Sequence, residues 1–174
     1  MKIHIALGAA LALLISLLPT HAGELLKNGD FMNQLDGWWL EQHSPALGQA
    51  SFEDKGPDDQ PAIAIELMEP GDQAWQMALS QKGFAVQKGK SYKVTFWAKA
   101  EPMVYGFFVS LGQASKEYRG LANKHDITLN PMWKQFEFDL VPDADEADAR
   151  LLFGNLAKTV GKVWLASVSL TTED

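Results

Sequence analysis

The stretch that decides the fold is residues 91–100, which read SYKVTFWAKA. Apolar and polar side chains alternate along it, with Tyr92, Val94, Phe96 and Ala98 on one face and Lys93, Thr95, Trp97 and Lys99 on the other. Because successive side chains of a strand point to opposite faces of a sheet, this period of two predicts a half-buried β-strand. Trp97 then lies on the polar and more accessible face.

The same alternation continues on both sides of this stretch. It is clearest in residues 133–140, where Phe136, Phe138 and Leu140 alternate with polar residues. Further strands are expected at 62–67, 75–81, 104–111, 125–129, 149–153 and 162–171. Turn sequences rich in Gly, Pro, Asn and Asp separate them, and the best helical candidate, residues 143–149, is short. The pattern predicts one all-β domain, an antiparallel β-sandwich of the jelly-roll type.

The first 22 residues have the features of a secretory signal peptide. Lys2 precedes an apolar run over residues 5–18, and the small residues Thr20 and Ala22 stand at the −3 and −1 positions. The run is shorter than the roughly 20 residues of a membrane-spanning helix, and no second run follows. We therefore expect cleavage after Ala22, a single mature domain over residues 23–174 without a membrane span, and a secreted or periplasmic location.

Composition argues against several classes of protein. Removing Lys2 with the signal peptide leaves 14 basic and 22 acidic residues, a net charge of −8, which disfavours nucleic acid as a partner. The absence of cysteine excludes disulfides, zinc–thiolate sites and thiol catalysis. His43 and His125 are too far apart for a metal-ligand motif, and the acidic run 143–148 lacks the central Gly of an EF-hand loop.

The sequence contains one candidate pair of catalytic residues, Glu137 and Asp139. Two carboxylates at this spacing on a strand share a face, as a glycoside hydrolase with an acid and a nucleophile about 5–5.5 Å apart would require. Outward-facing charges on an exposed strand are the ordinary explanation of the pair, and no serine-nucleophile motif is present. We expect a non-catalytic protein, with a small glycoside hydrolase as the least favoured alternative.

The supply of aromatic residues, six Trp, nine Phe and three Tyr, is the remaining feature. A flat aromatic ring stacks on the apolar face of a pyranose, and an outward Trp, which carries about 150–250 Å² of surface, favours a ligand that covers it. In the sequence GWWL at 37–40, alternation directs Trp38 inward and Trp39 outward. Packing in the core is the competing interpretation for each ring. The candidate ligand contacts are Trp39, Trp75, Gln76, Trp97, Lys99, Tyr105, Phe107, Gln113, Tyr118 and Asn155.

Ordered motifs along the chain resemble those of carbohydrate-binding modules of families 4, 9 and 22. They are NGDF at 28–31, LDGW at 35–38, WQMALSQ at 75–81, GKSYKVTFWAKA at 89–100, WKQFEF at 133–138, ARLLF at 149–153 and VWLASVSL at 163–170. The resemblance covers nearly the whole mature chain. It implies a jelly-roll sandwich of the galactose-binding-like type, in which a concave sheet binds β-glucan, xylan or related chains.

The resemblance implies that Gln76, in the 75–81 motif, and Trp97, in the 89–100 motif, occupy ligand-binding positions of the family. Modules of this kind often hold a structural calcium ion through acidic residues of the closing strand. Ala166 and Ser167 stand at those two positions here and supply no carboxylate. The sequence therefore predicts no cofactor and disfavours this calcium ion, although Asp30 lies near the opening turn.

These observations together predict a secreted, monomeric and non-catalytic protein that binds a polysaccharide or oligosaccharide of the β-glucan or xylan type. The alternative is a protein-interaction or cell-surface assembly module on the same fold, whose aromatic residues are covered by a partner protein.

Overall fold

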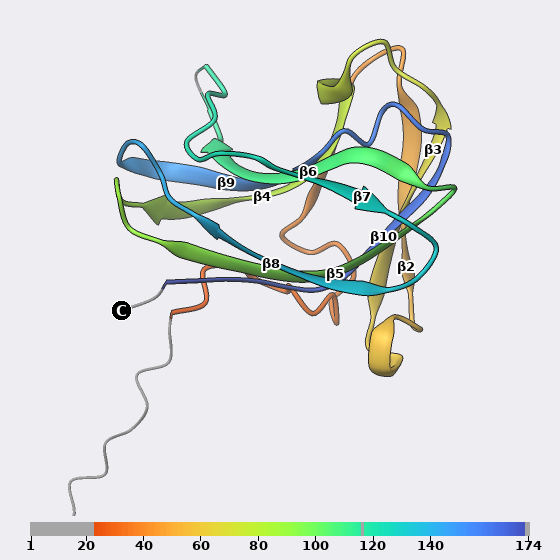
Figure 1. Ribbon diagram of the computed structural model, residues 1–174, viewed down its shortest axis with the longest axis horizontal. Coiled ribbons are helices and arrows are strands. Elements are labelled where there is room, and N and C mark those ends of the chain that lie inside the picture. The colour runs from red at the N-terminus through yellow and green to blue at the C-terminus, as the bar shows by residue number, and fades with distance from the viewer. Residues whose placement is uncertain (1–22, 116, 173–174) are drawn as a thin grey trace, which may run out of the picture.

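Two five-stranded antiparallel sheets pack face to face in the computed structural model, which describes residues 23–115 and 117–172 (Figure 1). Sheet I contains, in spatial order, β1 (Trp39–Gln42), β4 (Met77–Val86), β9 (Glu146–Gly154), β6 (Val104–Gln113) and β7 (His125–Leu129). Sheet II contains β2 (Leu47–Glu53), β3 (Ala62–Glu69), β10 (Gly161–Thr172), β5 (Tyr92–Glu101) and β8 (Lys134–Leu140). The predicted all-β sandwich is confirmed. The predicted signal peptide, residues 1–22, lies outside the described residues.

Strand β5 follows the alternation that its sequence predicts. It lies between β10 and β8, and its inward side chains Val94 and Phe96 are fully buried. The Phe96 ring meets the ring of Phe153 from sheet I edge-on, with 5.0 Å between centroids. Phe153 in turn stacks on Phe107 at 5.9 Å. Because these rings come from both sheets, aromatic packing joins the two layers of the core.

The strands that the sequence analysis missed are the edge strands β1 and β2. Every residue of these two strands is exposed or half-exposed, so neither strand has the run of alternating buried residues that marks the inner strands. The expected strand at 75–81 begins instead with a short 3-10 turn, η2 (Ala74–Gln76). A second such turn, η1 (Pro57–Asp59), lies between β2 and β3. The helical candidate at 143–149 is not a helix, because residues 146–149 pair with neighbouring strands at the start of β9.

A β-bulge in β6 changes which side chains face outward. Val104 pairs with Leu129, yet the next pair is Phe107 with Ile127, so β6 carries one residue more than β7 between these pairs. Gly106 has φ +68° there, a conformation that glycine adopts without strain. Beyond the bulge Phe107 points into the core and Phe108 points out.

Two connecting segments rise on the outer side of sheet I. In Figure 1 they are the teal segment that contains residues 117–122, at the left, and the olive segment that contains η2, at the right. The outer face of sheet I therefore lies between two loops, whereas sheet II closes the opposite side of the sandwich. Within the described residues, no helix is long and apolar enough to cross a membrane.

Candidate functional site

A row of paired residues crosses the outer face of sheet I. Trp39 of β1 pairs with Ser80 of β4, Ser80 pairs with Leu152 of β9, and Leu152 pairs with Ser110 of β6. Since neighbouring strands lie about 4.8 Å apart, the row is roughly 14 Å long. Trp39 stands at its edge with 69% of its surface exposed. The prediction that Trp38 is buried and Trp39 faces outward is confirmed.

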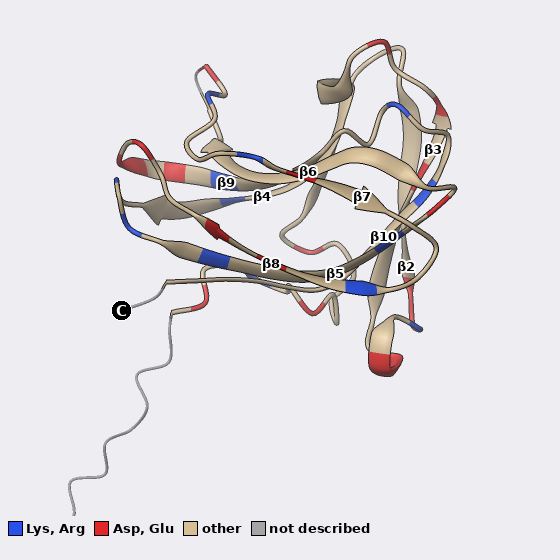
Figure 2. Cartoon of the chain, viewed as in Figure 1, with Lys and Arg blue, Asp and Glu red and all other residues tan. Residues whose placement is uncertain are grey.

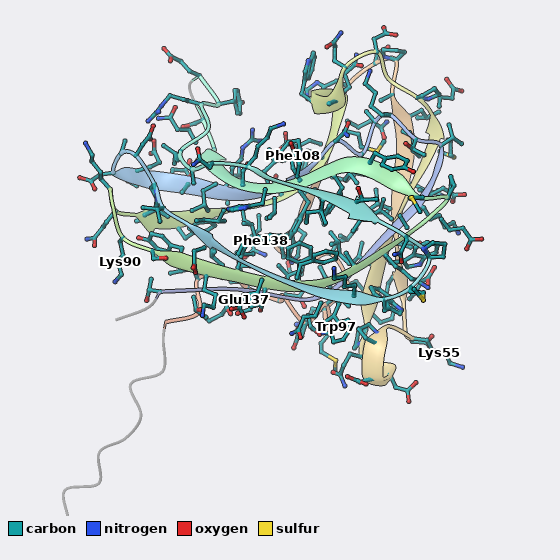
Figure 3. The ribbon with its side chains drawn as sticks, viewed as in Figure 1. Lys55, Lys90, Trp97, Phe108, Glu137 and Phe138 are labelled. Carbon is teal, nitrogen blue, oxygen red and sulfur yellow. The ribbon has the colours of Figure 1, made fainter. Side chains whose placement is uncertain are left out.

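Phe108 is an outward aromatic side chain on the same face, carried by β6 next to the edge strand β7. It pairs with Gly154 on one side and with Asp126 on the other, and Figure 3 shows it on the upper surface of the sandwich. A Cβ atom at position 154 would lie 2.2 Å from Cζ of Phe108, so the tip of the ring occupies the space above this glycine. The Nζ atom of Lys124 lies 5.2 Å from the ring centroid.

The sequence analysis expected Phe107 at the site and did not select Phe108. That expectation was wrong, because Phe107 is fully buried and packs on Phe96 and Phe153. The bulge at Gly106 shifts the alternation by one residue, and only the pairing with β7 reveals it. Tyr105, before the bulge, is 68% exposed as expected.

A polar network on this face connects the strand of Trp39 with Tyr118. The carboxylate of Glu41 accepts a hydrogen bond from the hydroxyl of Ser80 at 2.7 Å and forms an ion pair with the guanidinium of Arg150. Arg150 is only 9% exposed, and its Cζ atom lies 5.2 Å from the ring centroid of Tyr118. None of these three polar residues was predicted. The available signal was Arg150 itself, a charged residue in the apolar strand ARLLF with the same parity as outward Leu152.

Tyr118 lies in the segment between β6 and β7, and an ion pair joins this segment to the turn between β8 and β9. The guanidinium of Arg119 donates two hydrogen bonds to the carboxylate of Asp143, at 2.8 and 2.9 Å. This hydrogen bonding lowers the pKa of Asp143 and raises the pKa of Arg119. The predicted solvated acidic turn at 143–148 is thus tied to the Tyr118 segment through its first residue.

Trp75 stands at the η2 end of sheet I. It is 62% exposed, and its ring centroid lies 5.3 Å from that of His43. Its neighbour Gln76, a predicted ligand contact, is only 6% exposed. The Gln76 amide accepts a hydrogen bond from the backbone of Gln73 and donates one to the carbonyl of Ser44, both at 2.7 Å. The expectation for Gln76 was therefore wrong, because its amide holds the η2 turn.

Two further predicted contacts are held by the protein itself. The side-chain nitrogen of Asn155 donates to the carbonyls of Tyr105 and Gly106, at 3.0 Å each, and so supports the β6 bulge. The side-chain nitrogen of Gln113 donates to the Glu146 carboxylate at 2.8 Å. These contacts give Asn155 and Gln113 structural roles and leave their amide oxygens as the groups that could meet a ligand.

Trp97 and Lys99 lie on the other side of the molecule. Figure 3 shows Trp97 and Glu137 on the lower surface, opposite Phe108. The Nζ atom of Lys99 lies 4.5 Å from the ring centroid of Trp164 and 5.1 Å from that of Trp133. The structure therefore divides the predicted set between two faces, with Trp39 and Tyr118 on sheet I and Trp97 and Lys99 on sheet II.

The chain was compared with known families and solved structures. The family model CBM_4_9, described as a carbohydrate binding domain, matches residues 23–155. The chain belongs to this family. Carbohydrate-binding modules are a non-catalytic class of domain, although many are parts of enzymes. No curated protein sequence matches the chain.

Solved structures agree with this carbohydrate-binding domain in fold. A CBM4 structure is 20% identical with a TM-score of 0.67, and the match covers 84% of this chain and 99% of that one. The second N-terminal cellulose-binding domain of Cellulomonas fimi β-1,4-glucanase C is 22% identical with a TM-score of 0.60, over 95% and 99% of the two chains. An arabinose-bound α-L-arabinofuranosidase is 19% identical with a TM-score of 0.67, over 87% of this chain and 26% of that one.

Ala166 and Ser167 of β10 supply no carboxylate at the positions where the resemblance would place a calcium ligand. Glu24 lies beside the closing strand, and its carboxylate accepts hydrogen bonds from the backbone of Leu26 at 2.9 Å, the backbone of Leu170 at 3.0 Å and the hydroxyl of Ser169 at 2.5 Å. Among the described residues, no three His, Asp or Glu side chains come together as a metal site. Hydrogen bonds join this part of the carbohydrate-binding domain to β10.

The carboxylates considered for hydrolysis lie on β8 of the carbohydrate-binding domain, at the edge of sheet II. Glu137 is exposed and lies 3.5 Å from Nζ of Lys93 in an ion pair. The carbonyl of Asp139 lies 3.2 Å from Nε2 of His125. Exposed charge on the sheet II surface accounts for this pair.

Proposed function

We propose that this carbohydrate-binding domain binds a neutral β-linked glucan or xylan chain along the outer face of sheet I. Trp39, Phe108 and Tyr118 would stack on sugar rings. The observation that carries the proposal is their arrangement: three aromatic side chains, from an edge strand, a central strand and a loop, share one face with a polar network between them.

The extent of this face favours a chain over a single sugar. The row from Trp39 to Ser110 crosses three strand spacings, roughly 14 Å, which accommodates several linked sugar units. Trp39 and Tyr118 are 69% and 61% exposed, so a ligand that covered them would remove a large apolar area from water. The hydroxyls of Ser80 and Ser110, in the same row, would supply polar partners for sugar hydroxyls.

Electrostatics favour a neutral glycan over an acidic one. The charge of Arg150 is already matched by Glu41, and the mature chain carries a net charge of −8. In the cartoon of Figure 2, positions with Lys or Arg and positions with Asp or Glu are interspersed along the strands and loops. Both arginines of the chain are ion-paired, Arg119 with Asp143 and Arg150 with Glu41, so neither offers a free guanidinium to an acidic polysaccharide.

The same proposal includes secretion or periplasmic export. It is supported by the basic start, apolar run and small residues of the first 22 positions. A domain that binds polysaccharide outside the cell needs such a route.

Affinity electrophoresis of the mature chain in gels with soluble β-glucan or xylan tests this function. Wild-type protein and a Trp97→Ala variant should be retarded, whereas Trp39→Ala, Phe108→Ala and Tyr118→Ala should migrate faster. Trp97 is the matched control because it is an outward Trp on the opposite sheet. Retardation lost only in Trp97→Ala would move the site to sheet II. An absence of retardation, together with capture of a partner protein, would favour the protein-interaction alternative.

A further inference from the structure

We propose that Arg150 is a positioning residue that sets the orientation of the Tyr118 ring for stacking. Its guanidinium supports one side of the ring, so that the other side is presented to the sugar. This inference rests on the proposed function of the sheet I face.

Arg150 is itself held in place. Its side chain is nearly nine-tenths buried, and its guanidinium pairs with Glu41, which Ser80 also contacts. Its Nε atom lies 3.8 Å from where a Cβ atom of Gly112 would stand, so the guanidinium rests on the backbone of β6. This buried Nε atom has no hydrogen-bond partner among the described residues. The hydrogen bond from Arg150 to the Glu41 carboxylate is therefore the contact that holds the guanidinium in this position.

The Arg150 guanidinium also contacts the aromatic ring of Tyr118. The Cζ atom of Arg150 lies 5.2 Å from the ring centroid, within the range of a cation–π interaction. Tyr118 has φ +53°, a conformation that non-glycine residues rarely adopt. The ion pair of Arg119 with Asp143 fastens the next residue. The backbone and the ring of Tyr118 are therefore fixed by separate contacts before any ligand arrives.

The same contacts connect the two ends of the sheet I face. Glu41 and Trp39 are two residues apart on β1, so both side chains face outward. A continuous set of contacts thus runs from the Trp39 strand through Glu41 and Arg150 to Tyr118. Ordering the aromatic surface before binding reduces the conformational entropy that a ligand must overcome.

The first experiment observes the ring without any ligand. The chain has three tyrosines, so ring-labelled ¹³C-tyrosine NMR of the mature protein gives three sets of signals, assigned with Tyr118→Phe. We compare wild type with Arg150→Lys and with the double variant Glu41→Gln/Arg150→Met, which leaves no unpaired buried charge. The Tyr118 signals should shift and narrow in both variants, while buried Tyr92 and exposed Tyr105 stay unchanged. An unchanged Tyr118 signal in both variants would overturn the proposal.

The second experiment measures affinity for soluble β-glucan and xylan. Tyr118→Ala and the double variant should each weaken binding roughly three- to tenfold, and the triple variant should bind no more weakly than Tyr118→Ala alone. If the double variant weakens binding equally in the Tyr118→Ala background, Arg150 acts on the sugar directly and the positioning role is refuted. If Tyr118→Ala binds as wild type does, the proposed stacking by Tyr118 fails, whereas the NMR result still decides whether Arg150 orders the ring.

Discussion

Phe108 of β6 and Gly154 of β9 are paired across sheet I, and the tip of the Phe108 ring fills the space that a side chain at 154 would occupy. The absence of a side chain at position 154 of the middle strand thus leaves room for the aromatic ring of the neighbouring strand. Glycine is needed there for close approach, since 2.2 Å between a Cβ atom and Cζ is far below van der Waals contact.

Gly154→Ala should therefore displace the Phe108 ring and weaken binding to soluble β-glucan or xylan. Affinity electrophoresis measures the effect, and the matched control is the same change in a Phe108→Ala background. There the added methyl group meets no ring, so it should change little. An equal loss of affinity in both backgrounds would show that position 154 acts without Phe108.

Phe107 and Phe108 are adjacent, yet truncation of Phe107 should reduce stability whereas truncation of Phe108 should reduce glycan affinity. Phe107 is fully buried, so its truncation should lower the free energy of unfolding by about 3–5 kcal/mol. Phe108 faces outward, so its truncation should leave stability nearly unchanged and reduce glycan affinity. Urea unfolding and affinity electrophoresis of both variants test this, and a strongly destabilised Phe108→Ala protein would contradict the assignment of faces.

The contact between Arg119 and Asp143 should make the Tyr118 segment sensitive to acid. The hydrogen bond from Arg119 holds the pKa of Asp143 below its ordinary value of about 3.9. A lowered pKa in the folded state means that the contribution of this pair is complete above that ordinary value and is lost as the pH falls through the lowered pKa. Both groups are exposed, so the effect should be local rather than global.

Amide hydrogen exchange of residues 117–122 measures that local effect. After correction for the intrinsic pH dependence of exchange, the protection of these amides should decrease below about pH 4 in the wild type. Asp143→Asn should show the less protected behaviour already at neutral pH and no further change on acidification. Equal protection in both proteins at pH 7 would exclude the ion pair as the anchor of this segment.

Glu24 should stabilise the fold without a metal ion. Its carboxylate joins residues 24–26 to Ser169 and Leu170 of β10, so Glu24→Gln should lower the free energy of unfolding by about 1 kcal/mol. Thermal unfolding with calcium and with a chelator should give the same Tm in wild type. A Tm that falls on chelation would show that this part of the chain holds a cation after all.

Local pattern accounts for most of the fold, and it fails at identifiable places. The strands centred on residues 91–100 and 133–140 were predicted because one face of each is buried, which imposes period two on the sequence. The edge strands β1 and β2 lack that constraint and were missed. Gln76 was misassigned because the sequence does not reveal that η2 turns its amide toward Ser44 and Gln73.

The sequence alone determined the sandwich, the outward position of Trp39 and the family motifs, because alternation reports which residues of one strand share a face. It could not determine which of the two sheets a strand joins. Trp39 and Trp97 both face outward, yet their strands belong to different sheets and the two rings lie on opposite sides of the molecule. Only the tertiary structure decided this, together with the bulge that turns Phe108 outward, because strand pairing depends on hydrogen bonds between residues far apart in the chain.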